Sequence, residues 1–393
     1  MIADNEIIYL DNNATTQLDP AVIEEMLPFL TSYYGNPSSG YGFAAMARKA
    51  INLARERVAA LLGCEPTEIV FTSGGTESNN AVINSTLQLE AHSGHVIASA
   101  VEHSAVLRPS QDLAKRGCAV TFLGVDRHGN LDLGKLEAAI RPETALVSIM
   151  WANNETGVIF PIEKIAEICR KKGALFHTDA VQAAGKIPMC LRDTAINFLS
   201  LSAHKFHGPK GVGALYVDRR TRFSSLIGGG GQENGRRGGT ENVASIVGLG
   251  KAAELAPNYL AEGRCDIRSM RDRFEKSVLK AVCGASVNGA GADRIPNTSS
   301  FSFDGIESSA ALLFLDRQGI CCSAGSACRT GSQEASHVLR AMNSTGDDAR
   351  RSLRFSLGRF NTQAQIDRAI EVVPKVVEKL RRSAAPKPVP TAL

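Results

Sequence analysis

The chain has 393 residues, which is longer than one hydrophobic core normally grows, so we expect two domains. Its 44% hydrophobic and 21% charged content is typical of a globular protein and excludes disordered and fibrous classes. The formal net charge of +4 is too small to indicate a nucleic-acid-binding surface. No segment resembles a secretory signal or a membrane span, so we expect a cytoplasmic protein without nucleic-acid or membrane partners.

The nine cysteines are scattered along the chain and form no C-x-x-C pair. An odd number without paired spacing indicates free thiols in a reducing compartment. Neither the cysteine nor the histidine spacings bring four ligands together, which excludes a zinc ribbon. We therefore predict no resident metal site.

Short apolar runs alternate with helical patterns through the first two thirds of the chain. We predict strands at 69–72, 96–100, 145–150, 174–178, 196–202 and 212–217, and a helix at 162–172. This alternation is typical of a mostly parallel α/β sheet, which binds ligands at the carboxyl ends of its strands.

After about residue 240 the pattern changes to longer helices and fewer strands. We predict helices at 242–261, 267–282 and 363–382, and strands at 298–303 and 353–357. This part resembles a smaller α/β lobe. The Pro-rich end of the chain has no periodic apolar face, so we expect it to be frayed.

The strand at 69–72 runs directly into Ser73, Gly74, Gly75 and Thr76, and a helix pattern follows. Two glycines let the backbone approach an anion, and the start of a helix offers free N–H groups. The segment predicts a phosphate cradle. Taken alone, an ordinary strand-to-helix turn is the commoner explanation of such a segment.

Two charged residues follow the next strands in the same way. Asp179 follows the strand at 174–178, with Gln182 three residues later, and Lys205 follows the strand at 196–202. A buried carboxylate at Asp179 would need a cationic partner such as the ring nitrogen of pyridoxal phosphate, the alternative being a helix N-cap. A desolvated lysine can form a Schiff base with the same cofactor. Phosphate cradle, carboxylate and lysine together predict a pyridoxal phosphate site.

His103 and Asn154 follow the strands at 96–100 and 145–150. An imidazole can stack on the cofactor ring and move protons, and an amide can bond the phenolic oxygen of the ring. We therefore place both at the predicted site. A histidine at the start of a helix is the alternative for His103.

Residues 320–332 read ICCSAGSACRTGS, in which small residues follow a short apolar run. They predict a mobile loop that carries Cys328. The reactivity of an exposed thiol there depends on electropositive neighbours. We expect Cys321 and Cys322 to lie on the short strand itself and to serve as packing residues.

Arg354 alternates with apolar residues in the segment SLRFSLGRF. Leu353 and Phe355 are predicted to face the core, and Arg354 the opposite side of the strand. A fixed guanidinium there can grip a substrate carboxylate with two parallel bonds. A structural salt bridge explains the residue equally well.

Motifs along nearly the whole chain resemble those of the cysteine desulfurases, the NifS/IscS family of class-V aminotransferase-like, fold-type-I pyridoxal phosphate enzymes. They are LDNNATT at 10–16, GNPSS at 35–39, TSGGTESNN at 72–80, LSAHKFHGPKG at 201–211, GRRGGTEN at 235–242, SAGSAC at 323–328 and RFSLGR at 354–359. With WANNETG at 151–157 and GTENV at 239–243, the chain looks closest to the NifS branch, which serves nitrogenase cluster assembly.

The resemblance implies an α/β fold with two domains. The large pyridoxal-phosphate-binding domain would span 14–258 and contain a mostly parallel, seven-stranded sheet. The small domain would combine 1–13 with 259–382 and carry the catalytic-cysteine loop at about 321–333. A disordered tail would follow at 383–393.

The resemblance also implies a role for each predicted cofactor-binding residue. Lys205 would hold the cofactor, and Asp179 would pair with its ring nitrogen. Gln182 and Asn154 would face the ring hydroxyl, and His103 would stack on the ring. The phosphate would be held by Gly75, Thr76, Ser202, His204 and, from the neighbouring subunit of a homodimer, Thr240.

For catalysis, the resemblance implies that Arg354 and Asn154 bind L-cysteine and that Cys328 attacks its sulfur. The products would be L-alanine and a persulfide on Cys328, and an iron–sulfur scaffold or another acceptor protein would take the sulfur. Cys328 could also ligate an iron–sulfur cluster transiently. Two departures from the family, Tyr41 after Gly40 in place of a histidine and Asn234 in place of an arginine, would alter either the dimer-facing wall of the site or its substrate preference.

Two other classes of function remain open at this point. An aminotransferase or a selenocysteine-specific lyase of the same fold would not need Cys328. A non-catalytic sulfur carrier or iron–sulfur scaffold would use Cys321, Cys322 and Cys328, but it would have no use for a Schiff-base lysine.

Overall fold

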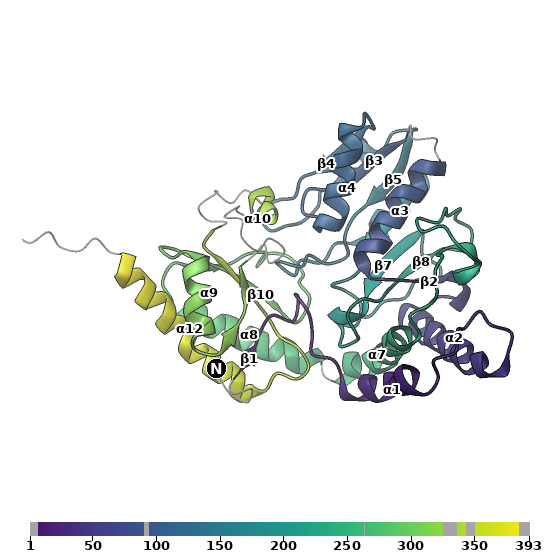
Figure 1. The fold of residues 1–393 in the computed structure, drawn as a ribbon. Helices are drawn as coiled ribbons and strands as arrows, with labels where there is room; N and C mark the ends of the chain where they lie inside the picture. Colours follow the sequence, from purple (N-terminus) through teal and green to yellow (C-terminus); the bar gives the residue numbers. More distant parts are fainter. Residues whose placement is uncertain (1–6, 90–93, 263, 325–335, 343–349, 385–393) are drawn as a thin grey trace, which may run out of the picture.

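The computed structural model describes residues 7–89, 94–262, 264–324, 336–342 and 350–384. Figure 1 shows two lobes side by side, a larger one with a central sheet and a smaller one that contains the first strand and the last helix. The chain therefore starts in the smaller lobe and crosses to the larger one.

A sheet of seven strands forms the centre of the larger lobe. In spatial order they are β2 (Ile69–Thr72), β8 (Gly213–Val217), β7 (Phe198–Ser202), β6 (Leu175–Asp179), β5 (Thr144–Ser148), β3 (His95–Ser99) and β4 (Val120–Leu123). The pairings from β7 to β4 are parallel, and β8 runs antiparallel to both of its neighbours. The predicted mostly parallel, seven-stranded sheet is confirmed.

The strand β4 is not predicted from the sequence, because no apolar run like those of the other six strands marks it. It lies at the edge of the sheet, where it pairs with β3 alone, and three of its four residues are partly or fully exposed. An edge strand needs no continuous apolar sequence, because one side of its backbone and part of its side chains face solvent.

Helices cover both faces of the central sheet because its side chains alternate between two hydrophobic cores. Val70, Leu146 and Phe198 lie in the core under one face, and their neighbours Phe71 and Val147 lie in the core under the other. The helices on the first face are α3 (Gly75–Leu89) and α4 (Ser104–Lys115). Those on the second are α2 (Gly42–Leu62), α5 (Leu133–Ala139), α6 (Ile162–Lys172) and α7 (Val243–Glu262), with α1 (Pro20–Thr31) packed on α7.

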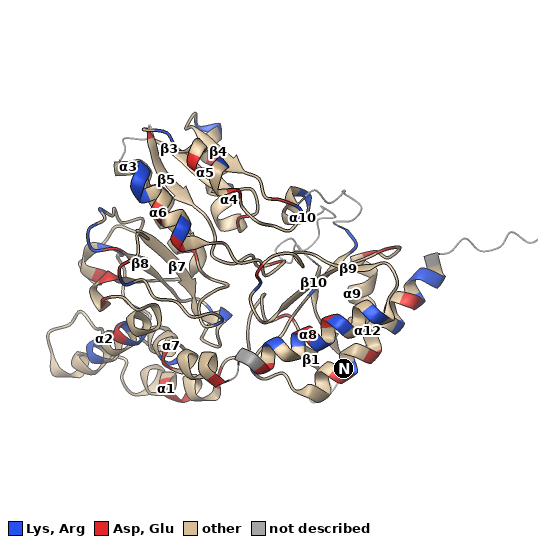
Figure 2. Cartoon of the chain, turned by 180° about the vertical axis from the view of Figure 1, so that it is seen from behind, with Lys and Arg blue, Asp and Glu red and all other residues tan. Residues whose placement is uncertain are grey.

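The smaller lobe has a separate core. It contains the four-stranded sheet β12 (Ser323–Ala324), β13 (Ser352–Ser356), β10 (Thr298–Phe303) and β9 (Ala285–Val287), and the pair β1 (Ile8–Tyr9) with β11 (Ile320–Cys321). The helices are α8 (Arg264–Ala281), α9 (Ser308–Asp316) and α12 (Gln363–Ala384). Figure 2 shows basic and acidic residues interleaved along the ribbon of α8 and α12, and apolar residues of both helices pack in this core.

The short helix α10 (His337–Ala341) belongs to the larger lobe by its packing. Val338, Leu339 and Met342 lie in the core of that lobe, together with Ile295. The predicted small domain, 1–13 with 259–382, thus includes residues that pack on the large one. The division into two domains stays a prediction, and the two separate cores support it.

The predicted boundaries of the C-terminal tail and of the cysteine loop differ from the structure. Two residues assigned to the tail, Ser383 and Ala384, end α12, and residues 385–393 lie outside the described part. The predicted cysteine loop at 321–333 overlaps β11 and β12, and its remainder from 325 is not described.

Among the residues that are described, no helix has the length and apolar character needed to cross a membrane.

Candidate active site

A pocket of about 700 Å³ opens at the carboxyl ends of the central strands. Its lining includes ten of the predicted site residues: Gly75, Thr76, His103, Asn154, Asp179, Gln182, Ser202, His204, Lys205 and Arg354. Thr240 does not line it, and Cys328 lies outside the described residues. The tertiary structure therefore brings together residues that are up to 279 positions apart in the sequence, from Gly75 to Arg354.

One end of the pocket is formed by the N-terminus of α3 and the end of β7. The helix begins at Gly75, so its first backbone N–H groups face the pocket next to Ser202. A Cβ atom on Gly75 would lie 2.5 Å from a methyl carbon of Val181, so glycine is the residue that lets the start of α3 lie this close to Val181. Free N–H groups, a hydroxyl and the positive end of a helix dipole suit a phosphate.

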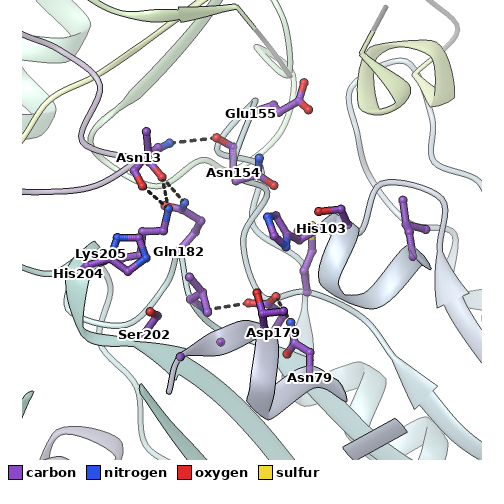
Figure 3. A pocket seen from close by; sticks show the side chains of 18 of the residues that line it. Asn13, Asn79, His103, Asn154, Glu155, Asp179, Gln182, Ser202, His204 and Lys205 are labelled. Atoms are coloured by element: carbon purple, nitrogen blue, oxygen red, sulfur yellow. Dashed lines mark hydrogen bonds between the residues drawn. The ribbon is translucent and has the colours of Figure 1, made fainter. Parts of the chain in front are cut away.

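Asp179 ends β6 on the floor of the pocket and is buried. Its Oδ2 accepts a hydrogen bond of 2.7 Å from Asn79, and its Oδ1 accepts one of 3.0 Å from the backbone N–H of Val181 (Figure 3). Within the described part of the chain, no Lys, Arg or His nitrogen lies within 4.0 Å of this carboxylate. A buried carboxylate held only by neutral donors suits a cationic ligand.

Lys205 reaches the pocket from the other side, at the end of the 3₁₀ helix η3 (Ala203–Lys205) that follows β7. Its Nζ donates to the carbonyl oxygens of Asn13 and Ala14, at 2.7 Å each. The Nε2 of Gln182 donates to the same Asn13 oxygen at 2.9 Å. Figure 3 shows Lys205 and Gln182 converging on Asn13 at one wall of the pocket.

His204, which neighbours Lys205, is held by a 3.1 Å hydrogen bond between its Nδ1 and the Oγ1 of Thr15. Burial, together with the smaller effects of the nearby Lys205, Lys210 and Lys186, lowers the pKa of His204 to about 4. The imidazole is therefore neutral near pH 7, and it can donate a hydrogen bond to an anion without adding a charge.

Arg354 forms the structural ion pair that was the alternative explanation of its position, and it also lines the pocket. It is 2% exposed, and its Nη2 forms a 2.7 Å ion pair with the Oδ1 of Asp11. Its Nη1 donates to the carbonyl oxygen of Asn154 at 2.8 Å. The guanidinium lines the pocket in this fixed position, while Leu353 and Phe355 face the core of the smaller lobe as predicted.

His103 is both a pocket residue and the N-cap of α4. Its Nδ1 accepts the backbone N–H of Ala105 at 3.1 Å, so the alternative of a helix-start histidine is also correct. In Figure 3 its ring lies between Asn154 and Asp179. This position suits an imidazole that stacks on a bound ring.

Two buried glutamates lie beside His103 and were not predicted. Burial raises the pKa of Glu102 to about 8, although hydrogen bonds from Ser99 and Met150 oppose the shift. Burial also raises the pKa of Glu155 to about 7, against the opposing effects of Ser336, Arg354 and His103. Glu155 accepts a 2.5 Å hydrogen bond from Ser336, which precedes α10, and so attaches that helix to the wall of the pocket.

Thr240 is exposed on the loop that precedes α7. An ion pair of 3.0 Å between Arg237 and Glu77 ties this loop to the first turn of α3. The departure Asn234 lies in the same region at φ +56°, a left-handed conformation that asparagine adopts more readily than arginine does. Tyr41 is exposed and precedes α2.

Cys321 lies on β11, and Cys322 lies between β11 and β12, where both are partly exposed. Burial raises the pKa of both thiols above its ordinary value. Protonated thiols are poor nucleophiles and poor metal ligands, so these two cysteines offer little support for the scaffold alternative.

Five residues around the pocket were not predicted as site residues, namely Asn13, Asn79, Glu102, Glu155 and Lys186. Asn13 and Asn79 lie within motifs that resemble the family, LDNNATT and TSGGTESNN, so the motifs carried a signal for them. Lys186 follows Gln182 by four positions, which is the spacing of one helical face. Glu155 lies in the segment WANNETG at 151–157, which also resembles the family. Glu102 had no such signal, because its importance depends on burial.

Comparison with known proteins agrees with this geometry. A family model described as aminotransferase class-V matches residues 8–369. The chain is 52% identical to a cysteine desulfurase of Trichormus azollae over 95% of this chain and 94% of that protein. A solved structure titled NifS-like protein has a TM-score of 0.89 at 38% identity and covers 95% of this chain and 100% of its own. A second, titled SspA in complex with cysteine, has a TM-score of 0.79 at 37% identity and covers 90% and 99%.

These matches span almost the whole chain and both lobes, and the identity is too high for a likeness of fold alone. The resemblance of the motifs to this group of enzymes is confirmed. The chain belongs to the class-V aminotransferase family.

Proposed function

We propose that the protein is a pyridoxal-phosphate-dependent cysteine desulfurase. The observation that carries this proposal is the pocket itself, in which a buried carboxylate without an ion pair among the described residues, Asp179, faces Lys205 beside the N-terminus of α3. The cysteine desulfurases that share about half of its sequence support the choice of reaction.

The residues of the pocket fit pyridoxal phosphate. Asp179 would pair with the protonated ring nitrogen, and Lys205 would form the Schiff base. Gln182 and Asn154 would lie on the ring hydroxyl side, and His103 would stack on the ring. The phosphate would be bound by Gly75, Thr76, Ser202 and His204. When bound, pyridoxal phosphate supplies an electron sink that stabilises negative charge on the substrate carbon.

The chain's own residues would then bind L-cysteine and take its sulfur. Arg354, fixed by Asp11 and Asn154, would hold the substrate carboxylate. The thiolate of Cys328, proposed from the sequence, would attack the substrate sulfur. An S–S bond forms, the Cβ–S bond breaks, and its electron pair stays on carbon, which takes up a proton to become the methyl group of L-alanine. The transferred sulfur is oxidised and the carbon is reduced, so no external oxidant is needed.

We propose a homodimer as the active form. Apolar side chains are exposed on α1, on the following turn and on α2, a surface we name the α1–α2 face: Ile23, Leu27, Leu30, Tyr34, Phe43 and Met46. A cluster of this kind is typical of a protein–protein interface. The exposed Thr240 would reach the phosphate site of the partner subunit.

We further propose that the persulfide on Cys328 supplies iron–sulfur cluster assembly, including that of nitrogenase, through a scaffold or other acceptor protein. The NifS-like titles of structural relatives support this destination. All the cysteines whose side chains are described are free thiols, which suits a reducing compartment such as the cytoplasm.

The substitution Cys328→Ala tests the sulfur chemistry. The variant should keep the yellow absorbance of the bound cofactor and lose sulfide release from L-cysteine by about 100-fold or more, because no other group is proposed as nucleophile. Cys283→Ala, which changes an exposed cysteine of the smaller lobe, is the control and should keep full activity. Sulfide release at the wild-type rate from Cys328→Ala would show that another mechanism operates.

The substitution Lys205→Ala tests the cofactor attachment. Borohydride reduction followed by mass spectrometry should find a phosphopyridoxyl group on Lys205 in the wild type and none in the variant. Lys210→Ala, which changes a second lysine of the pocket lining, should keep the modification. A phosphopyridoxyl group on Lys210 would refute the assignment.

A further inference from the structure

Lys186 is a buried lysine next to the pocket. Hydrogen bonds from the backbone N–H of Ala184 to Ala180 and of Lys186 to Ala183 wind residues 180–186 into helical turns. Gly185, at φ +72°, interrupts these turns, and the side chains of Gln182 and Lys186 meet through a direct hydrogen bond. The Lys186 side chain is 7% exposed, so its ammonium group points into the protein.

The Nζ of Lys186 contacts two amide oxygens. It donates to the Oε1 of Gln182 at 2.5 Å and to the Oδ1 of Asn13 at 3.1 Å. Within the described part of the chain, no carboxylate lies within 4.0 Å of it. Burial lowers the pKa of Lys186 well below its ordinary value, and Lys205 and Arg354 lower it further. Burying an amine in this way is costly unless its hydrogen bonds are made.

In both contacts Lys186 is the hydrogen-bond donor and an amide oxygen is the acceptor, which favours the observed orientation of the two amides. Gln182 must turn its oxygen towards Lys186, so its Nε2 faces the opposite way, towards the carbonyl of Asn13 at the pocket wall. Asn13 must likewise turn Oδ1 towards Lys186, and its Nδ2 then donates to the Oγ1 of Thr298 at 2.8 Å. Asn13 has further contacts that favour the same orientation, since its Nδ2 donates to the carbonyl oxygen of Asn154 at 3.2 Å and its Oδ1 accepts the Nδ2 of Asn297 at 3.1 Å. The Oε1 of Gln182 has no donor other than Lys186 among the described residues, so Gln182 is the amide that depends more on Lys186.

Asn13 also contacts Lys205, through its backbone carbonyl. The carbonyl oxygen of Asn13 accepts both the Nζ of Lys205 at 2.7 Å and the Nε2 of Gln182 at 2.9 Å. Both lysines thus bind Asn13. Lys205 binds the backbone carbonyl of Asn13, and Lys186 binds the side-chain oxygen of Asn13. Lys186 does not line the pocket itself. It contacts this wall through the side chains of Gln182 and Asn13.

We propose that Lys186 is a positioning residue, which holds the Gln182 amide with its N–H groups towards the pocket so that Gln182 presents a donor to the ring oxygen of the bound cofactor. This inference rests on the proposed function, since it assumes that the pocket binds pyridoxal phosphate. It assigns Lys186 no contact with the cofactor or the substrate.

A double-mutant cycle on cofactor binding tests the proposal. The affinity of the cofactor-free protein for pyridoxal phosphate is measured by absorbance titration for the wild type, Lys186→Met, Gln182→Leu and the double variant. Each single substitution should weaken binding by about 10-fold, which corresponds to the loss of one hydrogen bond. The double variant should bind within about 3-fold of Gln182→Leu, because Lys186 acts through Gln182. Lys164→Met, which changes an exposed lysine, should bind like the wild type.

A loss in the double variant equal to the product of the two single losses would overturn the proposal, because a purely structural role for Lys186 would not depend on Gln182. Wild-type affinity in Lys186→Met would overturn it as well. Failure of the wild type to bind pyridoxal phosphate would instead refute the proposed function.

Gln182→Glu gives a second test that does not remove the buried amine. A glutamate would form an ion pair with Lys186 and preserve the fold, but it has no N–H group to offer to the pocket. We expect the melting temperature to be at least that of the wild type and the affinity for pyridoxal phosphate to fall by about 10-fold. Unchanged affinity in a folded Gln182→Glu variant would refute the proposal even if Lys186→Met does not fold.

Discussion

Burial raises the pKa of two glutamates next to the pocket, Glu102 and Glu155, and so favours their protonated forms. The carboxyl group of Glu102 is the clearest case, since its Oε1 accepts hydrogen bonds from the Oγ of Ser99 at 2.6 Å and the backbone N–H of Met150 at 2.9 Å. Its Oε2 is buried and has no hydrogen-bond partner among the described residues. A neutral carboxyl group in this position avoids placing a second negative charge near Asp179, which itself raises the pKa of Glu102.

Glu102→Gln should therefore change how stability depends on pH. The folded pKa of about 8 lies above the ordinary value of 4.5, so the folded protein binds the proton more tightly than the unfolded chain does. The stabilisation of the folded protein by this proton is complete below pH 4.5, declines as the pH rises towards 8 and is lost above pH 8. Glutamine cannot titrate, so the variant does not lose stability in this way. The free energy of unfolding of the variant minus that of the wild type should therefore increase by about 1–3 kcal/mol as the pH rises across this range.

Urea unfolding at several pH values from about 5 to about 9 measures this difference. Glu163→Gln, which changes an exposed glutamate in the first turn of α6, is the control and should follow the wild type. A constant difference in stability between Glu102→Gln and the wild type at all pH values would contradict the predicted protonation of Glu102.

At the scale of elements, the phosphate end of the pocket depends on how closely three strands approach one another. Gly213 begins β8, where it pairs with Thr72 at the end of β2 and with Ser202 at the end of β7. A Cβ atom on Gly213 would lie 2.5 Å from the carbonyl oxygen of Leu201 and 2.7 Å from the Cα of Gly74. The antiparallel strand β8 thus holds the loop before α3 against β7 through a contact that only glycine allows.

Gly213→Ala should damage both stability and phosphate binding. The methyl group would push β8 away from backbone atoms that cannot move independently, so the protein should lose about 1–3 kcal/mol of stability. The affinity for pyridoxal phosphate should fall by about 10-fold, and the affinity for pyridoxal without the phosphate should fall less.

Thermal unfolding and cofactor titration measure the two effects of Gly213→Ala. Gly124→Ala is a matched control, because a Cβ atom on Gly124 would meet nothing within 4 Å. Wild-type stability of Gly213→Ala would show that β8 can shift without cost.

At the scale of the whole molecule, the pocket is closed by parts of both lobes. Asp179, Lys205 and the N-terminus of α3 come from the larger lobe, and Arg354 comes from β13 of the smaller one. Asn13 joins them, since its Nδ2 bonds Thr298 on β10 and its carbonyl oxygen accepts Lys205. The α1–α2 face adds the surface on which we expect a second subunit to bind.

Leu30→Glu should therefore separate the subunits. Leu30 is 64% exposed within the α1–α2 face, and a charge there would be buried without a partner in a dimer. We expect size-exclusion chromatography with light scattering to show a monomer, and pyridoxal phosphate to bind more weakly because Thr240 of the second subunit is lost. Leu313→Glu changes a leucine of α9 that is 53% exposed and should leave the dimer intact. A dimeric Leu30→Glu variant would show that the subunits meet elsewhere.

The sequence by itself determined the local elements and the main chemical groups. The helix at 162–172 has the predicted bounds, because its apolar residues repeat at helical spacing and Gly173 ends it at φ +79°. Apolar runs predicted six of the seven central strands, and Asp179 and Lys205 lie at the ends of two of them. These features depend on residues that are close together in the sequence.

Only the tertiary structure decided which groups are buried together. The protonation of Glu102 and the part played by Lys186 depend on desolvation by segments that are distant in the sequence, which no local pattern records. Asn13 became a junction of both lobes because its neighbours are Thr298 and Lys205, more than 190 positions away. The packing of α10 on the larger lobe has the same origin, since burial of apolar surface is satisfied by contacts across the whole fold.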